Sequence, residues 1–197
     1  MDNGGYRIAD QFATYFLTFT IVGWVDLFTR KECKQILIES LKYCQEIKGL
    51  MLYAYVIMES HMHLVASAHE KSNGLSSIIR DFKKFTSKEI VDWMQHNTIE
   101  SRREWLDIVF KYYGKYNANN SVYQVWKQDN CPKICVMPEF TLQKINYIHQ
   151  NPVVTGIVDD PIAYKYSSAR NYAGLSDTVL DVIVLDFTSD VGYVPLY

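Results

Sequence analysis

Two apolar segments separated by only two residues constrain the fold more than any other feature of this sequence. Residues 50–58 read Leu-Met-Leu-Tyr-Ala-Tyr-Val-Ile-Met, and residues 61–68 read His-Met-His-Leu-Val-Ala-Ser-Ala. Glu59 and Ser60 leave room only for a short turn, so the second segment must run back along the first. The pair predicts two adjacent antiparallel β-strands in the middle of the chain.

Helices and further strands are predicted on both sides of this pair. Residues 15–22 are aromatic and β-branched, which is typical of a buried strand. Apolar residues recur at three- and four-residue intervals in 30–48 and again after Asn73-Gly74, which indicates two helices. Further along the chain, residues 123–126 and 133–136 predict a hairpin around a turn at 129–132. A helix is predicted to start at Pro138 and to be stopped by Pro152. A short helix at 167–172 and a strand or helical turn after Thr178 complete the prediction.

The resulting order β-α-β-β-α-β-β-α predicts an α+β fold with an antiparallel sheet and helices on one face. The chain has 197 residues, of which 48% are hydrophobic and 21% charged, and this suits one globular domain. No apolar run approaches the roughly 20 residues of a membrane span, and the first residues do not have the form of a signal peptide. Four cysteines without a Cys-x-x-Cys pair argue against a disulfide scaffold or a thiolate zinc site. We therefore expect a cytoplasmic protein.

The formal net charge of −2 hides an uneven distribution of charged side chains. Residues 175–197 contain four acidic residues and no basic ones, whereas the stretch from Lys71 to Lys127 contains ten basic and six acidic residues. Arg80, Lys83, Lys84 and Lys88 follow one another at helical spacing. This pattern fits either an ordinary solvated helix face or a surface that binds nucleic acid.

His61-Met62-His63 opens the second strand of the central pair. Because side chains alternate along a strand, His61 and His63 project to one side and Met62 to the other. Two imidazoles about 7 Å apart along a strand can converge on one divalent ion, but they supply only two ligands. The spacing alone therefore fits a metal site or a merely polar sheet face.

Tyr147 lies on the polar side of the predicted helix that starts at Pro138. Gln143, Tyr147 and Asn151 are spaced by four residues, opposite the apolar Ile145 and Ile148. A phenol is a weak nucleophile at neutral pH unless a nearby base or Lewis acid activates it. Taken alone, Tyr147 fits a surface or packing role as well as a nucleophilic one.

Together, these motifs resemble a known family. The segment Tyr55-Val-Ile-Met-Glu-Ser-His-Met-His-Leu-Val resembles the His-hydrophobic-His strand of the single-tyrosine HUH transposases, the insertion-sequence-200-like family. Residues 147–158, Tyr-Ile-His-Gln-Asn-Pro-Val-Val-Thr-Gly-Ile-Val, and residues 160–170 are similar to the C-terminal signature of the REP-associated tyrosine transposases. The resemblance runs from about Tyr15 to Gly174, so we interpret 1–174 as an HUH transposase-like domain and 175–197 as an acidic extension packed on it.

The resemblance implies a ferredoxin- or RRM-like antiparallel sheet with helices packed mainly on one face. It also implies that His61, His63 and Asn151 bind a divalent metal, Mg²⁺ or Mn²⁺, which suits an uncharged amide oxygen. Tyr147 matches the nucleophile, which would cleave and rejoin single-stranded DNA next to hairpins through a 5′-phosphotyrosine link. Some relatives act as dimers and others as monomers, so the sequence leaves open whether this chain forms a homodimer.

Two other activities remain open at this point. A domesticated protein could keep the fold and bind DNA hairpins without cleaving them, and a metal phosphodiesterase could use water while Tyr147 is only structural. On either the transposase or the hairpin-binding interpretation, basic side chains hold the DNA backbone. The candidate DNA-binding residues are Arg80, Lys83, Lys84, Lys88, Arg102, Arg103 and Lys127.

Overall fold

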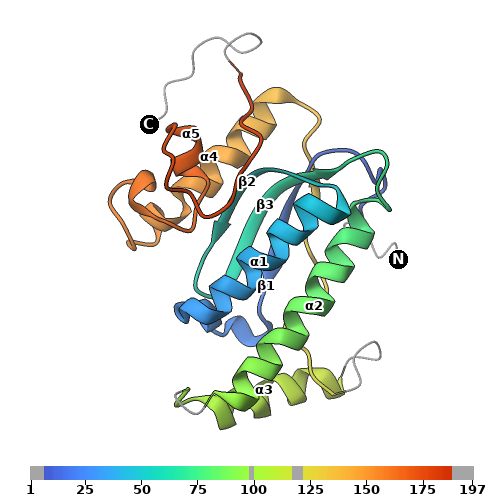
Figure 1. Cartoon of the computed structure of the whole chain (residues 1–197), viewed down its shortest axis with the longest axis vertical. Helices are drawn as coiled ribbons and strands as arrows, with labels where there is room; N and C mark the ends of the chain where they lie inside the picture. The colour runs from blue at the N-terminus through green and yellow to red at the C-terminus, as the bar shows by residue number, and fades with distance from the viewer. Residues whose placement is uncertain (1–6, 98–99, 117–121, 188–197) are drawn as a thin grey trace, which may run out of the picture.

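A four-stranded antiparallel sheet forms the centre of the described part of the chain, residues 7–97, 100–116 and 122–187 of a computed structural model (Figure 1). The predicted central pair is confirmed, because Leu50–Ile57 (β2) pairs with His61–Ala68 (β3), and the N–H of Met58 donates to the carbonyl of His61. The strand order is β2-β3-β1-β4, with β1 at Tyr15–Thr20 and a short β4 at Lys133–Ile134.

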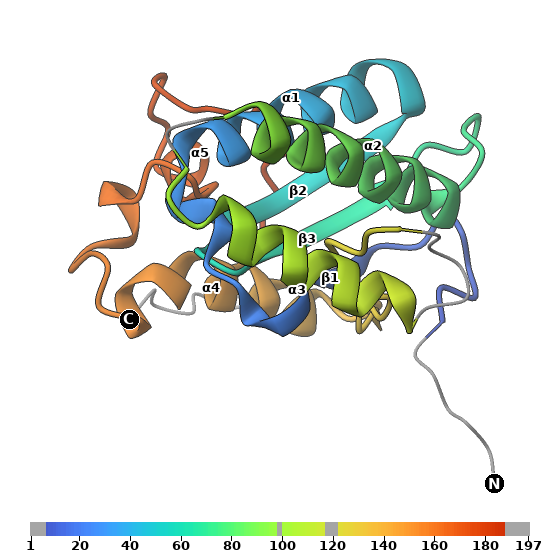
Figure 2. The same ribbon diagram turned by 90° about the horizontal axis from the view of Figure 1, so that it is seen from below.

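Two long helices, α1 (Lys31–Lys48) and α2 (Leu75–His96), cover one face of this sheet. In Figure 2 both helices lie above the strands. Leu37 of α1 and Phe82 of α2 are buried in the main core, together with Leu17 and Phe19 of β1. The main core therefore lies between the sheet and these two helices.

Helix α4 (Pro138–Val154) packs against the other face of the sheet, below the strands in Figure 2. Its buried Ile145 and Ile148 form a second, smaller core with Phe16 of β1, Val56 of β2 and Val65 of β3. The predicted α+β class is confirmed, with α4 as the long helix that lies opposite α1 and α2.

The prediction that Pro152 stops this helix is wrong, because α4 continues through it to Val154. Proline lacks only its own N–H, and so close to a C-terminus the helix loses a single hydrogen bond. The N–H of Thr155 still donates to the carbonyl of Asn151. Asn151 therefore stays within the helix, one turn after Tyr147.

The predicted hairpin of 123–126 with 133–136 is also wrong. Both segments instead lie along the free edge of β1, where Trp126 bridges to Ile21 and Ile134 pairs with Tyr15. Between them, the N–H of Thr18 donates to the carbonyl of Asn130. An edge strand offers unpaired backbone groups, and this long-range pairing competes with a local turn.

The remaining elements are short or peripheral. In the C-terminal extension, Leu180 is buried in the main core and the N–H of Ile183 donates to the carbonyl of Leu52 in β2, but the expected strand or helical turn does not form in 178–187. Residues 188–197 of this extension lie outside the described part.

None of the described helices combines the length and apolar character that a membrane crossing requires. The other elements are η1 (Val22–Trp24), η2 (Leu27–Thr29), α3 (Arg103–Lys115), η3 (Pro161–Ala163) and α5 (Ala169–Tyr172).

Candidate active site

Strand β3 places His61 and His63 on the same face of the sheet. The centroids of the two imidazole rings are 4.9 Å apart. Val65, two residues further along the strand, packs with Ile148 of α4, so this is the face that α4 covers. Both histidines therefore lie on the face of the sheet that is covered by α4, the helix that carries Tyr147.

Tyr147 of α4 lies beside His63. Their ring centroids are 5.3 Å apart and the ring planes meet at 67°. Phe16 of β1 contacts both residues, stacking on His63 at 5.2 Å and meeting Tyr147 edge-on at 5.9 Å. The Tyr147 side chain remains 49% exposed, so a large substrate can reach its phenol. A phenol and two imidazoles thus converge within one chain.

His63 is buried, and only one of its ring nitrogens takes part in a hydrogen bond within the described part of the chain. Nδ1 lies 3.0 Å from the hydroxyl oxygen of Thr18, which is its partner across the β1–β3 pair. Nε2 is buried and has no hydrogen-bond partner in the described part of the chain. If Nδ1–H donates to Thr18, Nε2 keeps a free lone pair, which is the tautomer that a metal ligand requires.

The protonation state of both histidines also fits a role as metal ligands. Burial, together with the neighbouring His61, lowers the pKa of His63 to about 3. Burial also lowers the pKa of His61 below its ordinary value. Both rings are therefore neutral at physiological pH, and a neutral imidazole can donate its lone pair to a metal ion.

No third ligand of the usual types accompanies the two histidines in the described part of the chain. Among the described residues, no group of three or more His, Cys, Asp or Glu side chains is arranged to hold a metal. The predicted third ligand, Asn151, is buried in α4 with 8% exposure, and no hydrogen bond joins it to His61 or His63. His149 points elsewhere, because its Nε2 is 2.9 Å from the hydroxyl oxygen of Ser168. The role of Asn151 as a ligand stays a prediction.

Sequence reasoning missed three side chains at this site. Phe16 and Thr18 contact His63 from β1, and Lys144 places its ammonium 5.9 Å from the centroid of the Tyr147 ring. Lys144 lies three residues before Tyr147 on the same helix, so helical spacing could have identified it. Phe16 and Thr18 could be found only from the register between β1 and β3, which one sequence does not reveal.

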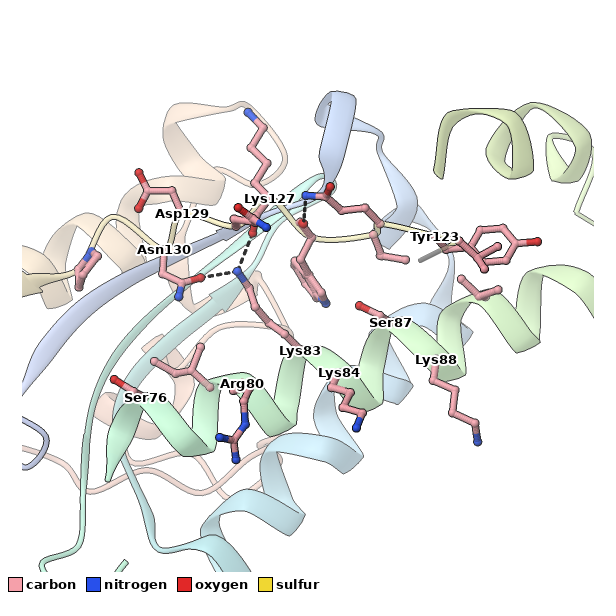
Figure 3. A pocket seen from close by; sticks show the side chains of 18 of the residues that line it. Ser76, Arg80, Lys83, Lys84, Ser87, Lys88, Tyr123, Lys127, Asp129 and Asn130 are labelled. Carbon is pink, nitrogen blue, oxygen red and sulfur yellow. Dashed lines mark hydrogen bonds between the residues drawn. The ribbon is translucent and has the colours of Figure 1, made fainter. Parts of the chain in front are cut away.

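Five of the seven predicted DNA-binding residues line a groove of about 1330 Å³ between α2 and residues 122–132. Arg80, Lys84 and Lys88 are exposed along α2, and their side chains point away from the edge segment in Figure 3. Lys127 comes from the edge segment and points away from α2. His61, His63 and Tyr147 do not line this groove.

Lys83 differs from its neighbours on α2 because its amine points into the groove wall. Nζ donates to the carbonyl of Lys127 at 2.7 Å and to the side-chain oxygen of Asn130 (Figure 3). Burial lowers the pKa of Lys83 to about 8. These contacts hold the edge segment against α2, and a direct DNA contact by Lys83 stays a prediction.

Arg102 and Arg103 lie at the start of α3 and do not line the groove. Arg102 forms ion pairs with Asp26 and with the buried carboxylate of Glu100. Arg103 is exposed. The structure therefore does not bring this pair of arginines together with the bases of α2.

Comparison with known proteins agrees with the motifs. The model of a family described as IS200-like transposases matches residues 15–120, just over half of the 197-residue chain. This match includes β3 with His61 and His63 and ends before α4. No curated protein gives a significant match.

Two solved structures are similar to this chain. A REP-associated tyrosine transposase bound to a REP hairpin matches with a TM-score of 0.63 and 17% identity, covering 99% of this chain and 100% of that one. At this identity the likeness shows a shared fold. A structure described as a transposase from Deinococcus radiodurans R1 matches with a TM-score of 0.42 and 17% identity, over 76% of this chain and 97% of that one, and is too distant to support an argument. The family match and the shared fold confirm the resemblance seen in the motifs, and the chain belongs to the IS200-like transposase family.

Proposed function

We propose that this transposase cleaves and rejoins single-stranded DNA next to hairpins through a 5′-phosphotyrosine intermediate. The observation that carries this proposal is the position of Tyr147, with its ring centroid 5.3 Å from that of His63 and its side chain half exposed. A tyrosine beside two neutral imidazoles suits attack on a phosphodiester, because the imidazoles can hold a Lewis acid next to the phenol.

The reaction exchanges one phosphodiester for another. The Tyr147 oxygen attacks phosphorus, the bond from phosphorus to the 3′ oxygen breaks, and the phenolic proton passes to the leaving 3′ oxygen or to water. The products are a 5′-phosphotyrosine and a free 3′-OH. Because the bond energy is kept in the phosphotyrosine, a later attack by a 3′-OH can rejoin strands without ATP.

His61, His63 and Asn151 are the residues that would hold a divalent metal. The buried Nε2 of His63, which has no partner among the described residues, fits this assignment. Mg²⁺ or Mn²⁺ bound there supplies Lewis-acid neutralisation of the scissile phosphate. The hydrogen bond with Thr18 orients the His63 ring through Nδ1, and Phe16 packs against both His63 and Tyr147.

The proposed substrate has a single-stranded part and a hairpin. Attack by Tyr147 needs a scissile phosphate that can approach the phenol and both imidazoles together, which a flexible single strand permits more readily than a duplex. The relative whose fold this chain shares was solved with a REP hairpin, which supports a hairpin partner here. The exposed Arg80, Lys84 and Lys88 offer cations for the stem.

A denaturing gel with 3′-labelled DNA tests the proposal. The labelled strand downstream of the cleavage site carries the 5′ phosphate, so it migrates as a protein adduct in Mn²⁺ and not in EDTA. We expect Tyr147→Phe to abolish the adduct. Tyr43→Phe on α1, an equally exposed tyrosine, serves as the matched control and should leave it intact.

Two results would contradict the proposal. Hairpin binding without any adduct or cleavage by the unchanged protein would identify a non-cleaving DNA-binding protein. Cleavage that survives Tyr147→Phe would identify water as the nucleophile.

A further inference from the structure

Trp24 is a large aromatic residue that is exposed next to the paired histidines. It ends η1, and its ring centroid lies 5.8 Å from that of His61, with the ring planes at 76°. The side chain is 59% exposed, although indole is among the most favourable side chains to bury. Trp24 lies outside both segments whose motifs resemble the transposases, residues 55–65 and 147–170.

The backbone at Trp24 is also unfavourable. Gly23 has φ 64° and Trp24 has φ 56°, so two consecutive residues adopt the left-handed conformation. Glycine accepts this conformation freely, whereas a bulky residue rarely adopts it. Strained residues of this kind are concentrated at ligand and active sites. An exposed ring on a strained backbone therefore indicates a binding role.

Lys127 adds a positive charge to the same place. Its Nζ lies 4.4 Å from the centroid of the Trp24 ring. Its backbone N–H donates to the carbonyl of Thr20 at 2.8 Å, which fixes the residue at the edge of β1. In Figure 3 its side chain points away from α2. Trp24 and Lys127 thus combine an aromatic face with a cation beside His61.

We propose that Trp24 and Lys127 form a subsite for one unpaired nucleotide of the DNA strand next to the scissile phosphate. The base stacks on the indole, and the ammonium contacts a phosphate of the same strand. Stacking on an aromatic residue tolerates any base, so the subsite selects single-stranded DNA over duplex DNA. This inference rests on the proposed function, which puts the scissile phosphate beside His61.

A binding assay in the Tyr147→Phe background tests the subsite without cleavage. The probe is a short oligothymidylate with one central 2-aminopurine, whose fluorescence is quenched when it stacks. We expect the parent to quench the probe, and Trp24→Ala to lose the quenching and to weaken binding about tenfold. Trp24→Phe should keep most of both effects. Trp105→Ala, which removes another half-exposed tryptophan from α3, is the matched control and should change neither.

Two further variants separate the subsite from a structural role. Lys127→Gln should reduce the slope of log affinity against log salt by about 0.7, the value for one phosphate contact on a single strand, whereas Trp24→Phe should not change it. Trp24→Gly relieves the left-handed strain, so it should weaken binding without lowering the thermal midpoint. A lowered midpoint with unchanged binding would overturn the subsite.

The outcomes also distinguish this inference from the proposed function. Unchanged affinity and quenching in Trp24→Ala would refute the subsite even if the Tyr147 adduct forms. Weakened binding in Trp24→Ala, in a protein that forms no adduct on hairpin DNA, would support the subsite and refute the cleavage chemistry.

Discussion

The hydroxyl oxygen of Thr18 lies 3.0 Å from Nδ1 of His63, across the pairing of β1 with β3. The other nitrogen of the ring is buried without a partner in the described residues. Thr18 therefore orients the His63 ring through Nδ1 and leaves Nε2 as the nitrogen available to a metal ion. Partners of this kind orient the ligands of metal sites and tune their affinity.

Thr18→Val keeps the shape of the side chain and removes the hydroxyl. We expect the Mn²⁺ concentration for half-maximal adduct formation to rise at least about tenfold, because the His63 ring loses the hydrogen bond that orients it. Thr18→Ser keeps the hydroxyl and should stay close to the parent. A titration of adduct yield against Mn²⁺ measures both, and equal curves for Val and Ser variants would show that the hydrogen bond has no part in metal binding.

Asn151→Ala tests the predicted third ligand. The amide is buried one turn after Tyr147, so its loss should raise the Mn²⁺ requirement by about tenfold or more. Asn151→Asp retains an oxygen ligand and should remain active. Gln150→Ala changes an exposed neighbour on the same helix and should have no effect. If Asn151→Ala keeps the Mn²⁺ requirement of the parent, the third ligand lies elsewhere.

Lys83 and Lys84 are adjacent on α2 but should respond differently. Lys84→Gln removes an exposed charge, so the slope of log affinity against log salt for hairpin DNA should fall by about 0.9 if it contacts one phosphate. Lys83→Met removes the donor to Lys127 and Asn130 and should lower the free energy of unfolding by about 1 kcal/mol without changing the slope. Chemical denaturation and salt titrations provide the measurements. A changed slope in Lys83→Met would make this lysine a direct DNA contact.

The buried carboxylate of Glu100 predicts an acid-sensitive contribution to stability. Its hydrogen bond from Arg30 lowers the pKa from the ordinary 4.5 to about 2. This contribution is complete above pH 4.5, and it is lost as the pH falls toward 2, because the unfolded chain binds the proton first. Glu100→Gln should lower the free energy of unfolding at pH 7 by about 2 kcal/mol and flatten its dependence on pH between 4.5 and 2.

Denaturant unfolding at several pH values measures this effect. Glu104→Gln, at an exposed position in the first turn of α3, is the matched control and should follow the parent. A pH profile of Glu100→Gln that is parallel to the parent would contradict the assignment.

The sequence predicts those features that depend on local spacing. The β2–β3 pair follows from two apolar segments around Glu59-Ser60, and the common face of His61 and His63 follows from strand alternation. Helical spacing places Tyr147 and Asn151 one turn apart, and α4 keeps that spacing through Pro152.

Features that depend on long-range pairing could not be predicted. Residues 123–136 contain good turn signals, yet the free edge of β1 offers more backbone partners than a local hairpin. The same register brings Thr18 to His63. Burial of the Lys83 amine likewise depends on an edge segment 44 residues further along the chain.

Because side chains alternate along β1, one short strand contributes both to the main core and to the surroundings of His63. Leu17 and Phe19 are buried against α1 and α2, whereas Phe16 and Thr18 contact His63 on the opposite side. Varying only positions 16 and 18 would therefore change the environment of the imidazole and leave the main core intact, provided that position 16 stays apolar and packs on Ile145 and Ile148. A directed-evolution library for altered metal preference could be confined to these two codons, and neighbouring odd-numbered codons could be reserved for thermostabilisation.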